Sequence, residues 1–178
     1  LQKILSELNV DQASSRRFRV LEEDQSLKRL SELRLDSKDD KYLSEWVLVC
    51  RAGRWIGYVD DEPLKTLPVQ HWANYNLSEY IRPLIELPSV GGNVPLWKAV
   101  AELERTKDGR LLVFNLAGLP SGTLDRVDIG EAVLKRLGLK FPKSFLEAAR
   151  SQNIYPLGIA IPQVVEGMIS SGIVERSD

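Results

Sequence analysis

Apolar residues along the chain change their spacing several times, and each spacing predicts a different element. Continuous apolar runs at 46–50 and 55–59 flank a short segment that contains Gly53, a pattern typical of a β-hairpin. Residues 111–116 and 121–124 repeat this arrangement and predict a second hairpin. Short strands are expected near Val20 and near Ile85, ahead of each hairpin.

Helical spacing separates these strands. Leu96, Val100 and Leu103 recur at the spacing of one helix face, and Pro95 fits the first turn of that helix. Asp128, with Glu131 three residues later, has the spacing of a capping box and predicts the start of a further helix. Ile129, Val133, Leu134 and Leu137 would form its apolar face, and Gly138 would end it.

The same order of elements occurs twice because the sequence repeats itself. A shift of 65 positions aligns Ala52-Gly53 with Ala117-Gly118, Gly57 with Gly122 and Asp60 with Asp125. Further upstream the best shift is 70, which aligns Glu32-Leu33 with Glu102-Leu103. The difference lies in the polar segment 34–45, which we interpret as a surface loop that is longer in the first copy.

A tail follows the second copy at about residue 140. Residues 143–150 predict a short amphipathic helix, and Pro162 fits the first turn of another that contains Val164, Val165, Met168 and Ile169. The segment 154–161 between them is too apolar to remain in water. It would either pack across the repeats or dock on a partner.

Composition narrows the function classes. The chain has 178 residues, 43% of them hydrophobic and 28% charged, so we expect a folded protein. The formal net charge of −1 disfavours a nucleic-acid polymer as partner, because such binding needs an excess of Lys and Arg. One cysteine and one histidine rule out an internal disulfide and a zinc site of four N and S donors within one chain. No apolar run approaches the roughly 20 residues that cross a bilayer.

We expect no catalytic residue in this segment. His71 lies in a polar connector, where a surface or packing role is favoured over a role as a general base. Cys50 ends an apolar strand run, which favours a buried, inert thiol over a redox role. The tryptophans are interpreted as packing residues in preference to ligand-stacking residues. They are Trp46, Trp55, Trp72 and Trp97.

A unit of strand, helix, hairpin and helix that occurs twice resembles a tandem pair of cystathionine-beta-synthase (CBS) domains. The family motif at the end of the third strand is a Gly, two apolar residues, a Ser or Thr, two further residues and an Asp. Gly122-Thr123-Leu124-Asp125-Arg126-Val127-Asp128 resembles it in the second copy, and 57–63 in the first. The resemblance implies an α+β fold, with two β-α-β-β-α repeats packed as a pseudo-two-fold pair and a helical tail.

The resemblance also implies a ligand site. In the family, the hydroxyl and the Asp of the motif hold the phosphate and ribose of an adenine nucleotide, so the candidate ligand-binding residues are Asp60, Thr123, Asp125 and Asp128. Here Asp60 and Asp125 occupy the hydroxyl positions, and Pro63 stands where the first ribose Asp would be. Since a carboxylate repels phosphate, we expect only weak nucleotide binding. The alternative is that Asp60 and Asp125 simply begin the closing helices.

A basic cluster lies beside the first strand. Arg16, Arg17 and Arg19 surround Phe18 and could contact a nucleotide phosphate, anionic lipid or a partner. A solvated or ion-paired strand edge is the alternative and is favoured.

Other segments resemble the C-terminal region of cyanobacterial site-2-protease homologues, which are membrane-embedded zinc metalloproteases. The segments are 14–20, 53–57 with 67–70, 118–125 and 148–158. The resemblance implies a cytoplasmic soluble domain of an integral membrane protein, joined to a protease domain whose catalytic zinc and H-E-x-x-H helix would precede Leu1. Because the chain begins with Leu and its only methionine is Met168, we expect it to be a fragment.

These observations predict a non-catalytic regulatory and dimerisation module of a membrane-embedded zinc metalloprotease. An adenine nucleotide would be a weak ligand, no metal or other cofactor is expected in the segment, and a homodimer formed through the CBS pairs is expected. A ligand-free interaction and assembly scaffold is the alternative. The expected organisation is an N-terminal helix or linker (1–13), the first repeat (14–70), the second repeat (71–139) and the tail (140–178).

Overall fold

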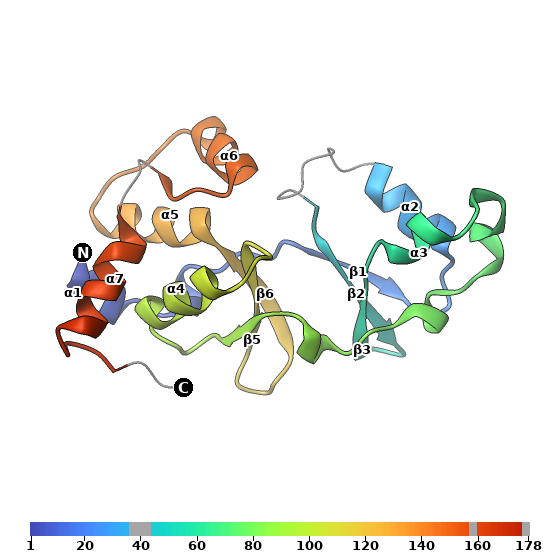
Figure 1. Ribbon diagram of the computed structural model, residues 1–178, viewed down its shortest axis with the longest axis horizontal. Helices are drawn as coiled ribbons and strands as arrows, with labels where there is room; N and C mark the ends of the chain where they lie inside the picture. Colours follow the sequence, from blue (N-terminus) through green and yellow to red (C-terminus); the bar gives the residue numbers. More distant parts are fainter. Residues whose placement is uncertain (36–43, 157–159, 176–178) are drawn as a thin grey trace. The chain divides into compact units, whose positions relative to one another are not determined.

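The computed structural model describes residues 1–35, 44–156 and 160–175 and contains two compact units (Figure 1). Unit 1 consists of Leu1–Arg16 and Pro88–Asp178, and unit 2 of Arg17–Leu87. Each unit has one three-stranded mixed sheet with helices packed on it. The predicted α+β fold class with a helical tail is confirmed.

Unit 2 is built on the sheet β1-β2-β3, in which β1 is parallel to β2 and β2 is antiparallel to β3. Its core is formed by leucines and valines of the strands and of α2. The elements are β1 (Phe18–Glu22), α2 (Leu27–Leu35), β2 (Trp46–Arg51), β3 (Arg54–Val59), α3 (Glu62–Thr66) and the 3-10 turns η2 (Val69–Asn74), η3 (Leu77–Tyr80) and η4 (Leu84–Glu86). Most of the predicted loop at 34–45 lies outside the described residues.

Unit 1 repeats this arrangement with the sheet β4-β5-β6, and the two ends of the chain contribute additional helices. Helices α1, α4 and α7 pack against one another around the core (Figure 1). The elements are α1 (Gln2–Glu7), η1 (Val10–Gln12), β4 (Ser89–Gly91), α4 (Leu96–Arg105), β5 (Arg110–Phe114), β6 (Pro120–Asp125), α5 (Arg126–Arg136), α6 (Lys143–Gln152) and α7 (Ile161–Ser170).

Three sequence-based details differ from the structure. The strand expected near Ile85 lies at β4 instead, and Ile85 is 91% exposed in η4. Its hydrophobicity misled the prediction because a three-residue strand carries too little pattern to be recognised. The helix expected to begin at Asp128 starts two residues earlier, at Arg126, and Pro95 is the N-cap of α4 rather than part of its first turn.

The register of the hairpins refines the repeat. Val49 pairs with Gly57 in unit 2, and Val113 pairs with Gly122 in unit 1. The shift between copies is therefore 65 positions in the last strand and 64 in the strand before it. One additional residue in the turn of the second hairpin accounts for the difference.

The segment ahead of the first strand of one unit closes the sheet edge of the other unit. Ser15 forms an antiparallel bridge with Thr123 on β6, and Arg82 forms one with Tyr58 on β3. Such bridges occupy part of the free edge, which limits strand pairing with other chains. This exchange is why Leu1–Arg16 belongs to unit 1 and 71–87 to unit 2.

Candidate functional site

The motif glycines lie where each bridge crosses the edge strand. A Cβ atom on Gly122 would be 2.6 Å from the carbonyl oxygen of Ser15, and a Cβ on Gly57 would overlap the carbonyl oxygen of Arg82. Glycine is therefore needed in both copies for close approach of two backbones. The identity that reveals the repeat in the sequence thus has a packing cause.

In the second copy, β6 delivers Asp125 to the N-terminus of α5. The Asp125 side chain accepts a hydrogen bond from the backbone N–H of Asp128 at 2.8 Å, and the Asp128 carboxylate accepts one from the backbone N–H of Asp125 at 3.0 Å. The capping box is thus formed by Asp125 and Asp128 rather than by the predicted Asp128 and Glu131. The interpretation of Asp125 as a helix-starting residue is confirmed.

A guanidinium from the tail lies on this capping box. Arg150 of α6 donates through Nε to Asp125 Oδ2 at 2.9 Å and through Nη2 to Asp128 Oδ1 at 3.0 Å. The Arg150, Asp125 and Asp128 side chains are only 8%, 15% and 5% exposed, so this is a buried ion-pair network. Ser15 adds a hydroxyl that donates to Asp128 Oδ2 at 3.2 Å.

Two carboxylates share one guanidinium in this cluster, and the titration of one of them, Asp128, is perturbed. Burial, together with the negative charge of Asp125, raises the pKa of Asp128 to about 7, although Arg150 acts in the opposite direction. Thr123, the remaining candidate, is 2% exposed, and its Oγ1 donates to the carbonyl oxygen of Ser15 at 3.4 Å. The structure therefore brings Thr123, Asp125 and Asp128 together, with all three engaged by other parts of the chain.

In the first copy, Asp60 is likewise bound by an arginine. Its Oδ2 accepts from Arg82 Nη1 at 3.0 Å, and its Oδ1 accepts from the backbone N–H of Glu62 at 3.0 Å. Arg82 also pairs with Glu86 at 2.7 Å, which lowers the pKa of that carboxyl. Pro63 is buried in the first turn of α3. This cluster is more exposed than the one in the second copy, with the Arg82 side chain 48% exposed.

A second pair of charges occurs at matching positions in both copies with its polarity reversed. Arg34 Nε pairs with Asp61 Oδ1 at 2.7 Å in unit 2, and Arg126 Nη2 pairs with Glu104 Oε2 at 2.5 Å in unit 1. In each case the last turn of the helix before the hairpin contacts the residue that follows the motif Asp. Attraction is kept although both residues differ between the copies, so the contact depends on opposite charge and not on residue type.

The remaining predicted residues are the basic cluster, the cysteine and the histidine. Arg16, Arg17 and Arg19 are exposed around the start of β1, and the role proposed for them stays a prediction. Cys50 is a buried free thiol as expected, and burial raises its pKa. His71 is exposed in η2, and its ring contacts that of Tyr75. Within the described ranges, no group of three or more His, Cys, Asp or Glu side chains is arranged to hold a metal ion.

Three of the four tryptophans contribute to packing, as predicted for them. Trp55 makes an edge contact with Phe18, with ring centroids 5.9 Å apart. Trp72 packs against the core of unit 2 and donates through Nε1 to the carbonyl oxygen of Leu67 at 3.0 Å. Trp97 packs against the core of unit 1.

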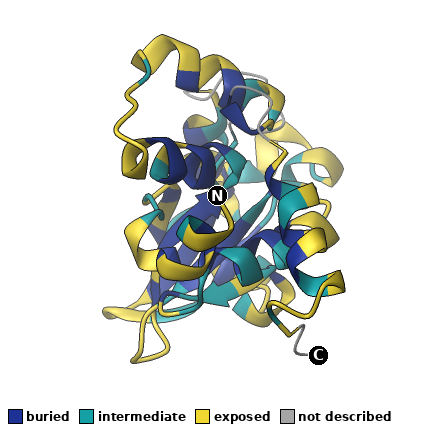
Figure 2. Ribbon diagram, turned by 90° about the vertical axis from the view of Figure 1, so that its left-hand side faces the viewer, coloured by how far each residue is buried: buried dark blue, intermediate teal, exposed yellow. Residues whose placement is uncertain are grey.

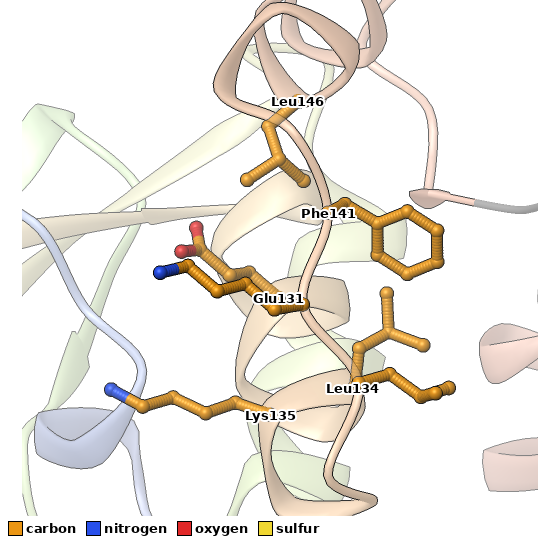
Figure 3. Close-up of a pocket in the computed structure, with 7 residues that line it drawn as sticks. Glu131, Leu134, Lys135, Phe141 and Leu146 are labelled. Carbon is orange, nitrogen blue, oxygen red and sulfur yellow. The ribbon is translucent and has the colours of Figure 1, made fainter.

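One pocket of about 250 Å³ lies in unit 1, away from the motif residues (Figure 3). Leu134 and Glu131 of α5, Phe141 of the connection and Leu146 of α6 line it, together with Lys135, Leu139 and Lys140. Neither this pocket nor the two arginines that bind the motif carboxylates was found from the sequence. Arg82 and Arg150 are 22 and 25 residues from their main partners, and no local pattern signals a contact at that distance.

No family model matches the sequence, and the search of curated proteins gave no match. Solved structures do match. The CBS domain of a bacterial CNNM/CorC family Mg²⁺ transporter in complex with ATP has 18% identity and a TM-score of 0.53, over 73% of this chain and 89% of that one. For the CBS pair of a putative Mg²⁺ transporter from Shewanella oneidensis MR-1 the values are 14%, 0.55, 74% and 73%.

CBSX2 in complex with AMP is a third similar structure, with 21% identity and a TM-score of 0.51, over 72% of this chain and 98% of that one. At such low identities the similarity concerns the fold. The chain therefore has the fold of a tandem pair of CBS domains.

Proposed function

We propose that this chain is a non-catalytic regulatory and assembly module that acts through protein contacts and binds adenine nucleotides only weakly. Two similar CBS-pair structures contain ATP or AMP, so nucleotide binding is the function to weigh first. The observation that supports weak binding is the engagement of the motif carboxylates: Arg150 binds Asp125 and Asp128, and Arg82 binds Asp60.

In the second copy, the motif carboxylates Asp125 and Asp128 are already bound by Arg150. A ribose hydroxyl would have to compete with a guanidinium for Asp128, in a site where that side chain is 5% exposed. A phosphate would be repelled by Asp125, because the single positive charge of Arg150 is divided between Asp125 and a second carboxylate. Removing one partner of a buried ion pair costs about 3–5 kcal/mol, which is comparable to the whole binding free energy of about 4 kcal/mol of a ligand with a Kd of about 1 mM.

Titration calorimetry and thermal unfolding with AMP, ADP, ATP and S-adenosylmethionine test this proposal. At ligand concentrations of about 1 mM we expect no binding heat and no change in the melting temperature of the natural chain. Asp125→Thr restores the hydroxyl of the family motif and keeps a residue that can cap α5, so it should gain AMP binding. Asp125→Asn removes the charge without restoring the hydroxyl and is the matched control.

A clear rise of the melting temperature of the natural chain with AMP or ATP would contradict the proposal. If Asp125→Thr and Asp125→Asn gained AMP binding to the same extent, the charge of Asp125 alone, and not the missing hydroxyl, would limit nucleotide binding.

We further propose that the module belongs to a membrane-embedded zinc metalloprotease of the site-2 kind, as a cytoplasmic domain. The support is the resemblance of four segments, of which 148–158 includes Arg150. Among the described residues, no helix is both long and apolar enough to cross a membrane. Apolar spans and an H-E-x-x-H motif encoded directly upstream would support this parent, and their absence there would contradict it.

A further inference from the structure

The connection between α5 and α6 is strongly basic although the whole chain is nearly neutral. We call residues 135–145 the basic connector; its sequence is KRLGLKFPKSF, with four basic residues and no acidic one. The chain as a whole has a formal net charge of −1. This segment of unit 1 therefore carries a local excess of positive charge.

Apolar side chains in the basic connector project into solvent. Leu137, Leu139 and Phe145 are 55%, 49% and 39% exposed, and the ring of Phe141 stacks on that of Phe145 with centroids 5.3 Å apart. In Figure 2 the connection and most of α6 have the colour of exposed residues. Gly138, at φ +78°, adopts the left-handed conformation directly after α5 and ends that helix.

The lysines of the basic connector take part in none of the ion pairs found among the described residues. Lys135, Lys140 and Lys143 are all exposed, whereas Arg136 pairs with Glu7 at 2.8 Å. The nearest acidic residues on the same elements are Glu131, which lines the pocket, and Glu147 on α6. Three ammonium groups are thus available to an anionic partner.

The pocket adjoins the basic connector. Leu134, Leu139, Phe141 and Leu146 provide its apolar lining, and Lys135 and Lys140 also line it. Figure 3 shows the pocket. A partner that matches the basic connector must therefore offer negative charge for the lysines directly beside apolar groups for the leucines and phenylalanines. An anionic bilayer surface has this chemistry, because its headgroups lie directly above its acyl chains.

We propose that the basic connector docks on the surface of an anionic lipid bilayer, with Leu137, Leu139 and Phe145 inserted among the headgroups and the three lysines over the phosphates. Nucleic acid would satisfy the lysines but leave the exposed leucines in water. The inference uses only this surface and holds whether or not the chain binds nucleotides or belongs to a protease.

Flotation with vesicles tests the proposal on the whole chain. We expect binding to vesicles of phosphatidylcholine and phosphatidylserine mixed at about two to one, weakening as salt is added, and little binding to phosphatidylcholine alone. Replacing Lys135, Lys140 and Lys143 with Gln should weaken binding by on the order of 100-fold, at about fivefold for each lysine. Leu139→Ser and Phe145→Ser should also weaken it, since they remove inserted apolar surface.

A matched control is available because Lys28, Lys65 and Lys107 are also exposed and lie outside the basic connector. Their triple replacement with Gln changes the net charge equally and should leave vesicle binding unchanged. Equal loss in the two triple variants would overturn the proposal, as would absence of binding to anionic vesicles. Insensitivity to both Ser variants would overturn the insertion of apolar side chains. Circular dichroism and melting temperatures confirm that each variant is folded.

Discussion

Arg150 is the residue that distinguishes the second copy from the first. Its guanidinium is buried between two carboxylates of the helix start, whereas Arg82 performs a similar contact to Asp60 at the surface. A buried pair tolerates the loss of one partner poorly, because the remaining charge keeps its desolvation cost. An exposed pair contributes little to stability, because water screens the attraction between the charges. The same chemistry therefore has different consequences in the two copies.

The pH dependence of stability follows from Asp128. Its pKa is about 7 in the folded chain against 3.8 as the ordinary value, because burial and the Asp125 charge outweigh the effect of Arg150. The folded chain thus holds this proton more tightly than the unfolded chain does. The stabilisation from this group is fully present below about pH 4 and is lost as the pH rises through about 7.

Urea unfolding of the natural chain and of Asp128→Asn at several pH values measures this effect. The stability of the natural chain relative to the variant should decrease from about pH 4 to about pH 8. A difference that stays constant or grows with pH would show that Arg150 keeps the carboxylate ionised throughout.

At the scale of elements, the described part of the tail packs against the core of unit 1. Tyr155, Ile161 and Val165 belong to the core of unit 1, and the Arg126 guanidinium lies over the Tyr155 ring at 5.8 Å. Asn153, in the left-handed conformation, ends α6 and meets Gly109. Apolar contact and a buried ion pair therefore hold α6 and the residues after it in place.

Two helical glycines provide a matched test of this fit. A Cβ on Gly130 of α5 would overlap the ring of Pro156, whereas a Cβ on Gly167 of α7 would meet nothing within 4 Å. Alanine has the higher helix propensity, so Gly167→Ala should raise the free energy of unfolding by about 0.5–1 kcal/mol. Gly130→Ala should lower it, because the proline ring cannot move aside as a flexible side chain would.

Denaturant unfolding compares the two variants, and limited proteolysis reports on the tail. Faster cleavage within 140–156 is expected for Gly130→Ala alone. If both alanine variants were equally stabilising, the contact between α5 and Pro156 would not contribute to the stability of the folded chain.

For the whole molecule, each unit closes its own sheet with a segment that lies outside its strand and helix repeat, through the bridge of Ser15 with Thr123 in unit 1 and of Arg82 with Tyr58 in unit 2. Neither sheet is complete without residues that lie outside its own strand and helix repeat. The predicted division at 13, 70 and 139 describes repetition in the sequence and stays a prediction, whereas the compact units group residues by contact.

The homodimer remains a prediction for the whole molecule. We expect light scattering to give a mass of twice 20.1 kDa, since closed two-fold assembly is common among soluble oligomers. Leu116 and Ile85 are 90% and 91% exposed and are the first apolar positions to replace with Ser. A mass of 20.1 kDa at every concentration would contradict the dimer, and a dimer that survives both replacements would use a different surface.

The sequence by itself determined the repeat, the order of its elements and the helical tail. These depend on local spacing: alternation or runs in strands, helical periodicity in α4 and α7, and glycines at the turns. The sequence also showed that Asp60 and Asp125 stand at the motif positions where the family has Ser or Thr. It misplaced the capping box by one turn because both Asp125 and Asp128 have suitable partners three residues later.

Only the tertiary structure decided what those carboxylates do. Arg82 and Arg150 approach them from segments whose position depends on packing, the first through a bridge to β3 and the second through a helix beyond the repeats. The sequence also could not predict that the basic connector is exposed, because the leucines and phenylalanines at 137–145 are equally compatible with a buried core position. Local periodicity selects elements, whereas long-range packing selects which charges are paired and which surface is left open.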